Sequence, residues 1–116
     1  MTEPTKEQIK EFWEWCGFKD TFEGDTGAYY WKAPNGDAGV DLPPIDLNNL
    51  FKYAVPMAIG DYKYTLAMTT DVEYGSRENT YTFGLSSDPL VIDAEVTDRD
   101  PALALFWTLW EVMKND

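Results

Sequence analysis

The C-terminal segment from Pro101 to Met113 constrains the fold of this chain more than any other part of its sequence. At a helical period of about 3.6 residues, its apolar side chains form two adjoining stripes, which leave only Ala104, Thr108 and Glu111 as a narrow polar arc. A helix that is apolar on two sides has to be covered on two sides. The segment therefore predicts a helix that lies in the middle of a core or forms half of a subunit contact.

Length and composition predict one folded domain, residues 1–116. Hydrophobic residues make up 44% of the chain and aromatic residues 16%, which is far more apolar surface than a disordered acidic chain carries. The single cysteine cannot form an internal disulfide, and no apolar run is long enough to cross a bilayer or to serve as a signal peptide. We therefore expect a cytoplasmic protein that is not bound to a membrane.

The chain is strongly acidic, with 21 Asp and Glu residues against 9 Lys and Arg residues and a net charge of -12. This charge repels the phosphates of nucleic acids and of anionic membranes, so we expect no direct binding to either. Two interpretations of the acidity remain open. It keeps the protein soluble, or it forms a surface that imitates a polyanion and binds a basic partner.

The first half of the chain predicts a helix, a hairpin and a second helix. Thr5 and Gln8 have the spacing of a capping box, so a helix is expected over residues 6–16. Residues 19–27 are polar, contain glycine and are expected to form a loop. The other elements predicted in this half are hairpin strands 28–32 and 38–42 and a short helix that begins after Asp46 and ends before Pro56.

The second half of the chain predicts three strands and the final helix. Apolar and polar residues alternate, as in a strand buried on one face, over residues 62–69, 81–85 and 90–97. Asp100 and Pro101 then provide a cap and a first turn for a helix that runs to Lys114. The predicted fold class is α+β, an antiparallel sheet of about four to five strands with the N-terminal, middle and C-terminal helices packed in layers.

The residue types in this chain argue against catalysis. Histidine, the commonest general base near neutral pH and the commonest zinc ligand, is absent from the sequence. Cys16 falls on the apolar face of the first predicted helix, where a cysteine packs as a small hydrophobic residue. No nucleophile-elbow pattern and no glycine-rich phosphate loop is present. We therefore predict a protein that is not an enzyme, with no catalytic residue, metal site or cofactor.

Acidic and aromatic side chains are the candidates for binding. Two carboxylate pairs, Asp71 with Glu73 and Asp93 with Glu95, are spaced so that each pair lies on one face of a strand. Such pairs can hold magnesium, but the same spacing is typical of any solvent-exposed sheet face. Aromatic residues that lie outside the apolar faces of the predicted helices, Tyr29 among them, are typical of protein contact sites. The predicted partner-binding residues are Asp71, Glu73, Asp93, Glu95, Asp98, Trp15, Tyr30 and Trp31.

Three segments, residues 10–18, 43–56 and 100–107, resemble a group of small proteins encoded by bacteriophages and prophages and akin to the phage ABA-sandwich domain. The resemblance spans most of the chain. It implies a phage or prophage origin, a layered fold of helices and sheet, and the cytoplasm of a bacterial host as the location. It supplies no catalytic motif.

Three hypotheses of function follow. The first is a non-catalytic phage accessory protein that inhibits a host defence protein, with the acidic surface imitating a polyanion and binding a basic surface of that host protein. The second is a self-associating scaffold protein of a phage, a homodimer through the C-terminal helix. The third is a metal- or nucleotide-binding protein that uses the strand carboxylates.

Overall fold

The computed structural model describes residues 2–39, 41–72, 79–88 and 91–115. In this part of the chain, helices and two antiparallel sheets of three strands each give an α+β fold, as predicted. The elements in chain order are α1 (Lys6–Trp15), β1 (Lys19–Glu23), β2 (Ala28–Lys32), β3 (Ala38–Gly39), α2 (Leu47–Asn49), η1 (Leu50–Ala54), α3 (Val55–Gly60), β4 (Thr65–Val72), β5 (Asn79–Ser86), β6 (Ala94–Asp98) and α4 (Pro101–Asn115). We refer to the continuous helix formed by α2, η1 and α3 as the middle helix.

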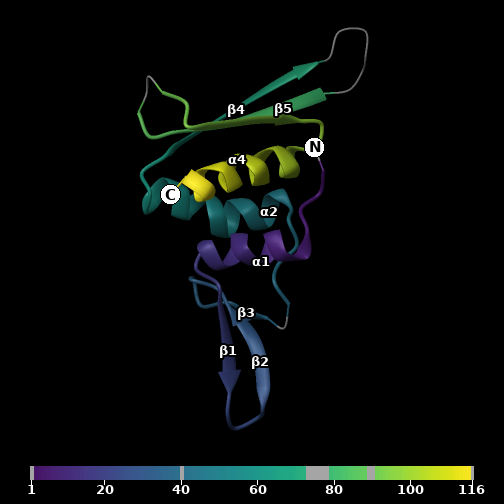
Figure 1. Ribbon diagram of the computed structural model, residues 1–116, viewed down its shortest axis with the longest axis vertical. Coiled ribbons are helices and arrows are strands. Elements are labelled where there is room, and N and C mark those ends of the chain that lie inside the picture. Colours follow the sequence, from purple (N-terminus) through teal and green to yellow (C-terminus); the bar gives the residue numbers. More distant parts are fainter. Residues whose placement is uncertain (1, 40, 73–78, 89–90, 116) are drawn as a thin grey trace.

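The two sheets lie at opposite ends of an elongated molecule that measures 59 × 32 × 19 Å (Figure 1). The β4-β5-β6 sheet covers α4, and the middle helix and α1 follow on the other side of α4. The β1-β2-β3 sheet projects from the helical stack beyond α1, on the side away from α4. The prediction of one sheet of four to five strands is therefore replaced by two smaller sheets, with the helices stacked between them.

Helix α4 is covered on both sides within the chain, as its apolar pattern requires. One side packs against β5 and β6, and the other packs against α1 and the middle helix, where the rings of Phe106 and Phe12 lie 4.7 Å apart between centroids. The predicted polar arc is wrong at two of its three positions, because Ala104 and Thr108 are fully buried and only Glu111 is exposed. With both sides covered, the apolar pattern no longer calls for a second subunit on this helix.

The hydroxyl of Thr108 is tolerated in the core because backbone carbonyls satisfy it. Thr108 Oγ1 lies 2.7 Å from the carbonyl oxygen of Ala104, one turn earlier, and 3.1 Å from that of Phe83 on β5. A buried hydroxyl that donates a hydrogen bond costs little, whereas an unpaired one is expensive. The pairing explains why a threonine fits where the sequence pattern predicted exposure.

Helix α1 follows its sequence signals. The backbone N–H of Gln8 donates to Thr5 Oγ1 at 3.2 Å and the backbone N–H of Thr5 donates to Gln8 Oε1 at 2.9 Å, which confirms the capping box. The buried face carries Trp13, whose Nε1 donates to the carbonyl oxygen of Pro43 at 2.9 Å. Cys16 is buried at the end of the helix, and burial raises the pKa of its thiol.

The middle helix continues past Pro56, where the sequence predicted that it would end. Proline has no N–H to donate to the carbonyl four residues earlier, and its ring crowds that carbonyl. The helix accommodates Pro56 by widening over Leu50–Ala54 into a π-helical segment, in which the N–H of Val55 donates to the carbonyl oxygen of Leu50, five residues earlier. The wider turn accommodates the loss of the hydrogen bond that the N–H of residue 56 would donate, so the helix continues to Gly60.

Several predicted strand assignments are also wrong, and β4 begins at Thr65 rather than at residue 62. Residues 19–23 form β1 instead of a loop, because they find pairing partners along β2. Strand β3 is only two residues long, and Val40 within the predicted strand lies outside the described residues. Strand β6 begins at Ala94, so residues 91–93 of the predicted strand 90–97 lie outside it, and Leu90 lies outside the described residues. The Asp93 carboxylate accepts hydrogen bonds from the backbone N–H and hydroxyl of Ser87 at 2.6 and 2.7 Å and closes a turn there.

Candidate functional site

The candidate site is the projecting sheet, β1 to β3, together with its junction with the middle helix. Strands β1 and β2 extend beyond the helices rather than lying across them (Figure 1). In their register Phe22 faces Tyr29, and the two rings lie 4.7 Å apart between centroids. Yet Phe22 is 55% exposed and Tyr29 is 68% exposed. The aromatic pair stabilises the hairpin across its strands and still leaves most of both rings in contact with water.

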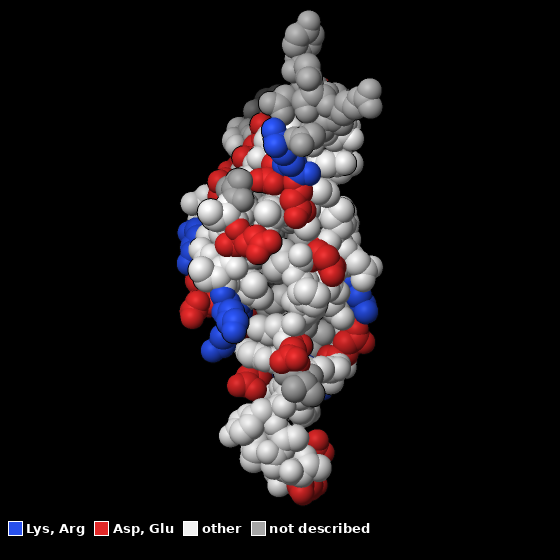
Figure 2. Space-filling model, turned by 90° about the vertical axis from the view of Figure 1, so that its right-hand side faces the viewer, with Lys and Arg blue, Asp and Glu red and all other residues white. Residues whose placement is uncertain are grey.

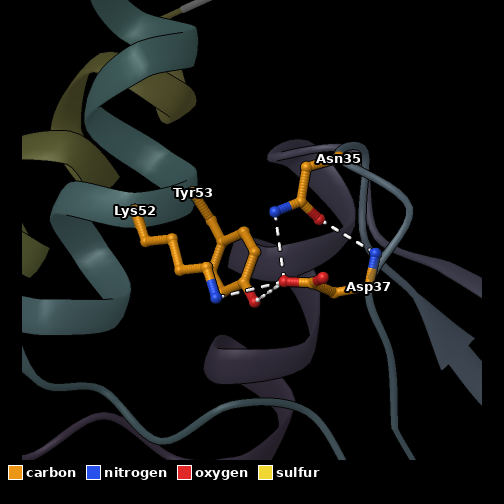
Figure 3. Close-up of polar contacts among 4 residues, drawn as sticks. All are labelled: Asn35, Asp37, Lys52 and Tyr53. Carbon is orange, nitrogen blue, oxygen red and sulfur yellow. Dashed lines mark hydrogen bonds and ion pairs between the residues drawn. The ribbon is translucent and has the colours of Figure 1, made fainter.

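A hydrogen-bonded network holds the base of the projecting sheet to the middle helix (Figure 3). Asp37, in the turn before β3, accepts hydrogen bonds at Oδ2 from the Tyr53 hydroxyl at 2.9 Å and from Asn35 Nδ2 at 3.1 Å, and it forms an ion pair with Lys52 Nζ at 3.1 Å. Asn35 Oδ1 in turn accepts from the backbone N–H of Asp37 at 3.0 Å. The network therefore connects the β2–β3 turn to two successive residues of the π-helical segment.

The ring of Tyr53 gives this junction an apolar side. It meets the ring of Phe18 edge-on at 5.0 Å and that of Trp13 at 6.1 Å, both measured between centroids. Phe18 directly precedes β1, so one tyrosine contacts the start of the projecting sheet with its ring and the β2–β3 turn with its hydroxyl. The projecting sheet is thus fixed at its base, where Trp31 also packs against the core, whereas Phe22 and Tyr29 further along it are largely exposed.

The electrostatics of the network favour a structural role over acid–base chemistry. Hydrogen bonds from Tyr53, Lys52 and Asn35 hold the pKa of Asp37 below its usual value, and the Asp37 carboxylate raises the pKa of Lys52. Both groups therefore stay charged near neutral pH. A general acid or base needs a pKa near the working pH, and these shifts move both groups away from it.

Two shallow hollows flank Tyr53. The larger, about 320 Å³, lies beside Pro34, Lys52 and Asp61 and reaches the buried Cys16. The smaller, about 110 Å³, is lined by apolar residues that include Phe18 and Trp31 and by Asp37 and Asp41. Within the described residues, no group of three or more Cys, Asp or Glu side chains is arranged to hold a metal ion. The metal-binding hypothesis gains no support from this part of the chain.

The structure does not bring the predicted acidic residues together. Asp71 lies on β4 opposite Thr80, whereas Glu95 lies on β6 opposite Gly84, four residues further along β5 and at the other edge of the sheet. Asp93 closes the turn before β6, and Asp98 accepts a hydrogen bond from the backbone N–H of Asp100 at 2.8 Å before α4. Glu73 lies outside the described residues.

The predicted aromatic residues separate into three places. Trp31 shares one face of the projecting sheet with Phe22 and Tyr29, because all three alternate to the same side, whereas Tyr30 points to the opposite face. Trp15 lies on α1, where its ring stacks on that of Tyr62 at 5.4 Å. Phe22 is not among the predicted contact residues, because the sequence predicts a loop over residues 19–27. Its symmetrical placement with Tyr29 about the four-residue turn 24–27 is the signal that could have found it.

Acidic side chains are dispersed over the face of the molecule drawn in Figure 2. On the face drawn in Figure 2 they are scattered from the β4-β5-β6 end to the tip of the projecting sheet, with basic side chains among them, and they do not merge into one continuous patch. No described helix is long and apolar enough to cross a membrane. No protein-family model, curated protein or solved structure matches this chain.

Proposed function

We propose that this chain is a non-catalytic binding protein that docks on a partner protein through the aromatic face of its projecting sheet. The observation that carries the proposal is the exposure of the Phe22–Tyr29 pair on strands that extend away from the helices. Exposed aromatic residues at the end of a projection are expensive to leave in water, and they are the residues that dominate protein interfaces. A partner surface that covers them supplies the apolar layer that the projecting sheet lacks.

The charge of the chain favours a partner with a basic surface. The net charge is -12, and acidic residues flank the aromatic pair on β1, where Asp20 and Glu23 lie on either side of Thr21 and Phe22. Such a field accelerates encounter with a basic partner and weakens as salt is added. Because the acidic residues are scattered, the proposal gives them this steering role and gives the contact itself to the aromatic face.

The proposal extends to the biological role. Together with the sequence resemblance to phage and prophage proteins, an acidic protein with a projecting contact surface fits an inhibitor that binds a basic protein of a bacterial host. This extension is supported by the charge and by that resemblance alone.

The experiment compares two double variants whose replaced residues are similarly exposed. Phe22→Ser/Tyr29→Ser removes the aromatic pair, and Val91→Ser/Ile92→Ser removes two apolar residues of similar exposure in the loop before β6. The tagged wild-type protein is first used to isolate a binding partner from bacterial lysate, and the affinity of each variant for that purified partner is then measured by calorimetry. Removal of an aromatic contact pair should weaken binding by about 2 kcal/mol or more, roughly thirtyfold in Kd.

Two results would overturn the proposal. One is equal loss of affinity in both double variants, which would place the contact elsewhere. The other is a partner that binds the Phe22→Ser/Tyr29→Ser variant as tightly as the wild type. Circular dichroism of both variants verifies that each remains folded. Stopped-flow association kinetics of the wild type at low and high salt test the steering role, because the association rate should fall as salt is added.

A further inference from the structure

Strand β1 leaves one backbone edge open. It lies at the end of the β1-β2-β3 order, so β2 pairs with one side of it and no described strand pairs with the other. Its five residues contain no proline, and its register with β2 runs without a bulge. Natural proteins protect such an edge with proline, bulges or charged side chains, because an open edge pairs with another strand. Of these devices β1 has only the charged side chains Lys19, Asp20 and Glu23.

The hydrogen bonds of the neighbouring turn show which groups β1 presents. The N–H of Ala33 donates to the carbonyl oxygen of Asp37 at 2.7 Å, so the odd-numbered residues of β2 direct their backbone groups toward β3 and the even-numbered ones toward β1. Tyr30 and Lys32 therefore bond to Thr21 and Lys19. By the same alternation, the N–H and C=O groups of Asp20 and Phe22 point to the open edge.

The side chains of β1 are self-complementary about Thr21. In an antiparallel pairing of two copies centred on that residue, Lys19 faces Glu23 of the second copy, and Glu23 faces its Lys19. Asp20 faces Phe22 of the second copy, so the outward backbone groups meet as two hydrogen-bonded pairs. No two like charges lie opposite each other, and the two threonines meet at the two-fold axis.

We propose that the open edge of β1 pairs with β1 of a second copy in this register, so that two chains form a two-fold dimer with one continuous sheet. A small sheet without a helix layer gains from added strands, because each new ladder supplies backbone hydrogen bonds and cross-strand contacts. Antiparallel pairing also places the two helical bodies at opposite ends of the joined sheet, which keeps their like net charges apart.

This inference is independent of the proposed function. The dimer uses the backbone edge of β1 and the side chains of Lys19 and Glu23, which lie on the face opposite to Phe22. The partner contact uses the aromatic face. The dimer and the partner contact are tested with different variants, so a result that overturns one proposal does not affect the other.

Charge reversal tests the register directly. Lys19→Glu alone places two Glu–Glu pairs across the axis, and Glu23→Lys alone places two Lys–Lys pairs there. Each single variant should dimerise roughly tenfold more weakly than the wild type, since both cross-strand pairs turn from attraction to repulsion. An equimolar mixture of the two single variants forms Glu–Lys pairs at both positions and should recover the dimer. The double variant Lys19→Glu/Glu23→Lys should recover it as well.

Sedimentation velocity over a concentration series at about 0.15 M salt measures each case, since surface charges within a Debye length still interact there. Circular dichroism verifies that every variant keeps its fold. The expected result is a dimer for the wild type, the double variant and the mixture, and weaker association for each single variant alone. A wild type that stays monomeric at every concentration overturns the proposal. So do single variants that associate like the wild type, or a mixture that associates no better than its components.

Discussion

The buried hydroxyl of Thr108 gives the sharpest test of how α4 is packed. If the helix followed its sequence pattern, Thr108 would face water beside Glu111, and its replacement would change the free energy of unfolding by no more than about 0.5 kcal/mol. In the structure Thr108 is fully buried, and its hydroxyl bonds to the backbone of α4 and of β5. The two arrangements therefore predict very different effects for the same substitution.

The magnitude for Thr108→Ala follows from three contributions. Loss of the hydrogen bond costs about 1 kcal/mol, and loss of the buried methyl group costs about another 1 kcal/mol. Alanine returns about 0.5 kcal/mol through its higher helix propensity. The variant should therefore be less stable by about 1.5 kcal/mol, which lowers Tm by roughly 5 °C in a domain of this size. Thr108→Lys places a charge at a fully buried position and should cost several kcal/mol, enough to unfold much of the protein.

Urea unfolding followed by tryptophan fluorescence measures both variants, with Glu111→Lys as the matched control on the same helix. Glu111 is exposed, so that change should alter the midpoint very little. If Thr108→Lys were as stable as Glu111→Lys, or if Thr108→Ala matched or exceeded the wild type, the reasoning about α4 would be refuted. The side of α4 that carries Ala104, Thr108 and Glu111 would then be exposed to water.

Three further outcomes are expected. Trp13→Phe loses the hydrogen bond to Pro43 and part of a buried ring, and should lower the free energy of unfolding by about 2 kcal/mol in the same urea assay. The Cys16 thiol, whose pKa is raised by burial, should resist alkylation at mildly alkaline pH in the native protein and react in urea, as mass spectrometry can show. The hydrogen bonds to Asp37 lower the pKa of its carboxyl group in the folded protein below the usual value of 3.8. The stability that they give is present above pH 3.8 and is lost as the pH falls through the lower folded pKa. Thermal melts of Asp37→Asn at a series of pH values should therefore lack that part of the acid dependence.

Elements specified by adjacent residues could be predicted from the sequence. The capping box of Thr5 and Gln8 defines the start of α1 through two local hydrogen bonds, and the helix follows. The final helix begins at Pro101 because Asp100 caps it, with its Oδ1 accepting from the backbone N–H of Ala102 at 2.9 Å. Such signals involve partners within one turn of helix, so the sequence contains all of the information.

Elements that depend on pairing between segments, or on a local change in helix geometry, could not be predicted in this way. Residues 19–23 become a strand only because they pair with β2. The middle helix continues past Pro56 only because the π-helical segment before it changes the hydrogen-bonding pattern where proline has no N–H to donate. The burial of Thr108 depends on a carbonyl of β5, 25 residues earlier in the chain. The same limit applies to the candidate site. Trp31 is a predicted contact residue, whereas Phe22 becomes a candidate only once residues 19–23 are recognised as a strand that pairs with β2.

The junction at Tyr53 decides whether the projecting sheet can serve as a binding surface. A projection that swings freely loses conformational entropy when it docks, whereas one held at its base has already lost it on folding. The ion pair of Lys52 with Asp37 is exposed, and exposed ion pairs contribute little to stability, so the charge alone does not hold the base. The ring of Tyr53 against Phe18 and Trp13 contributes more, because it adds aromatic contacts on the side of the buried core. The two faces of the projecting sheet and its open edge are therefore presented in fixed directions, and a partner on one face leaves the edge free for a second copy.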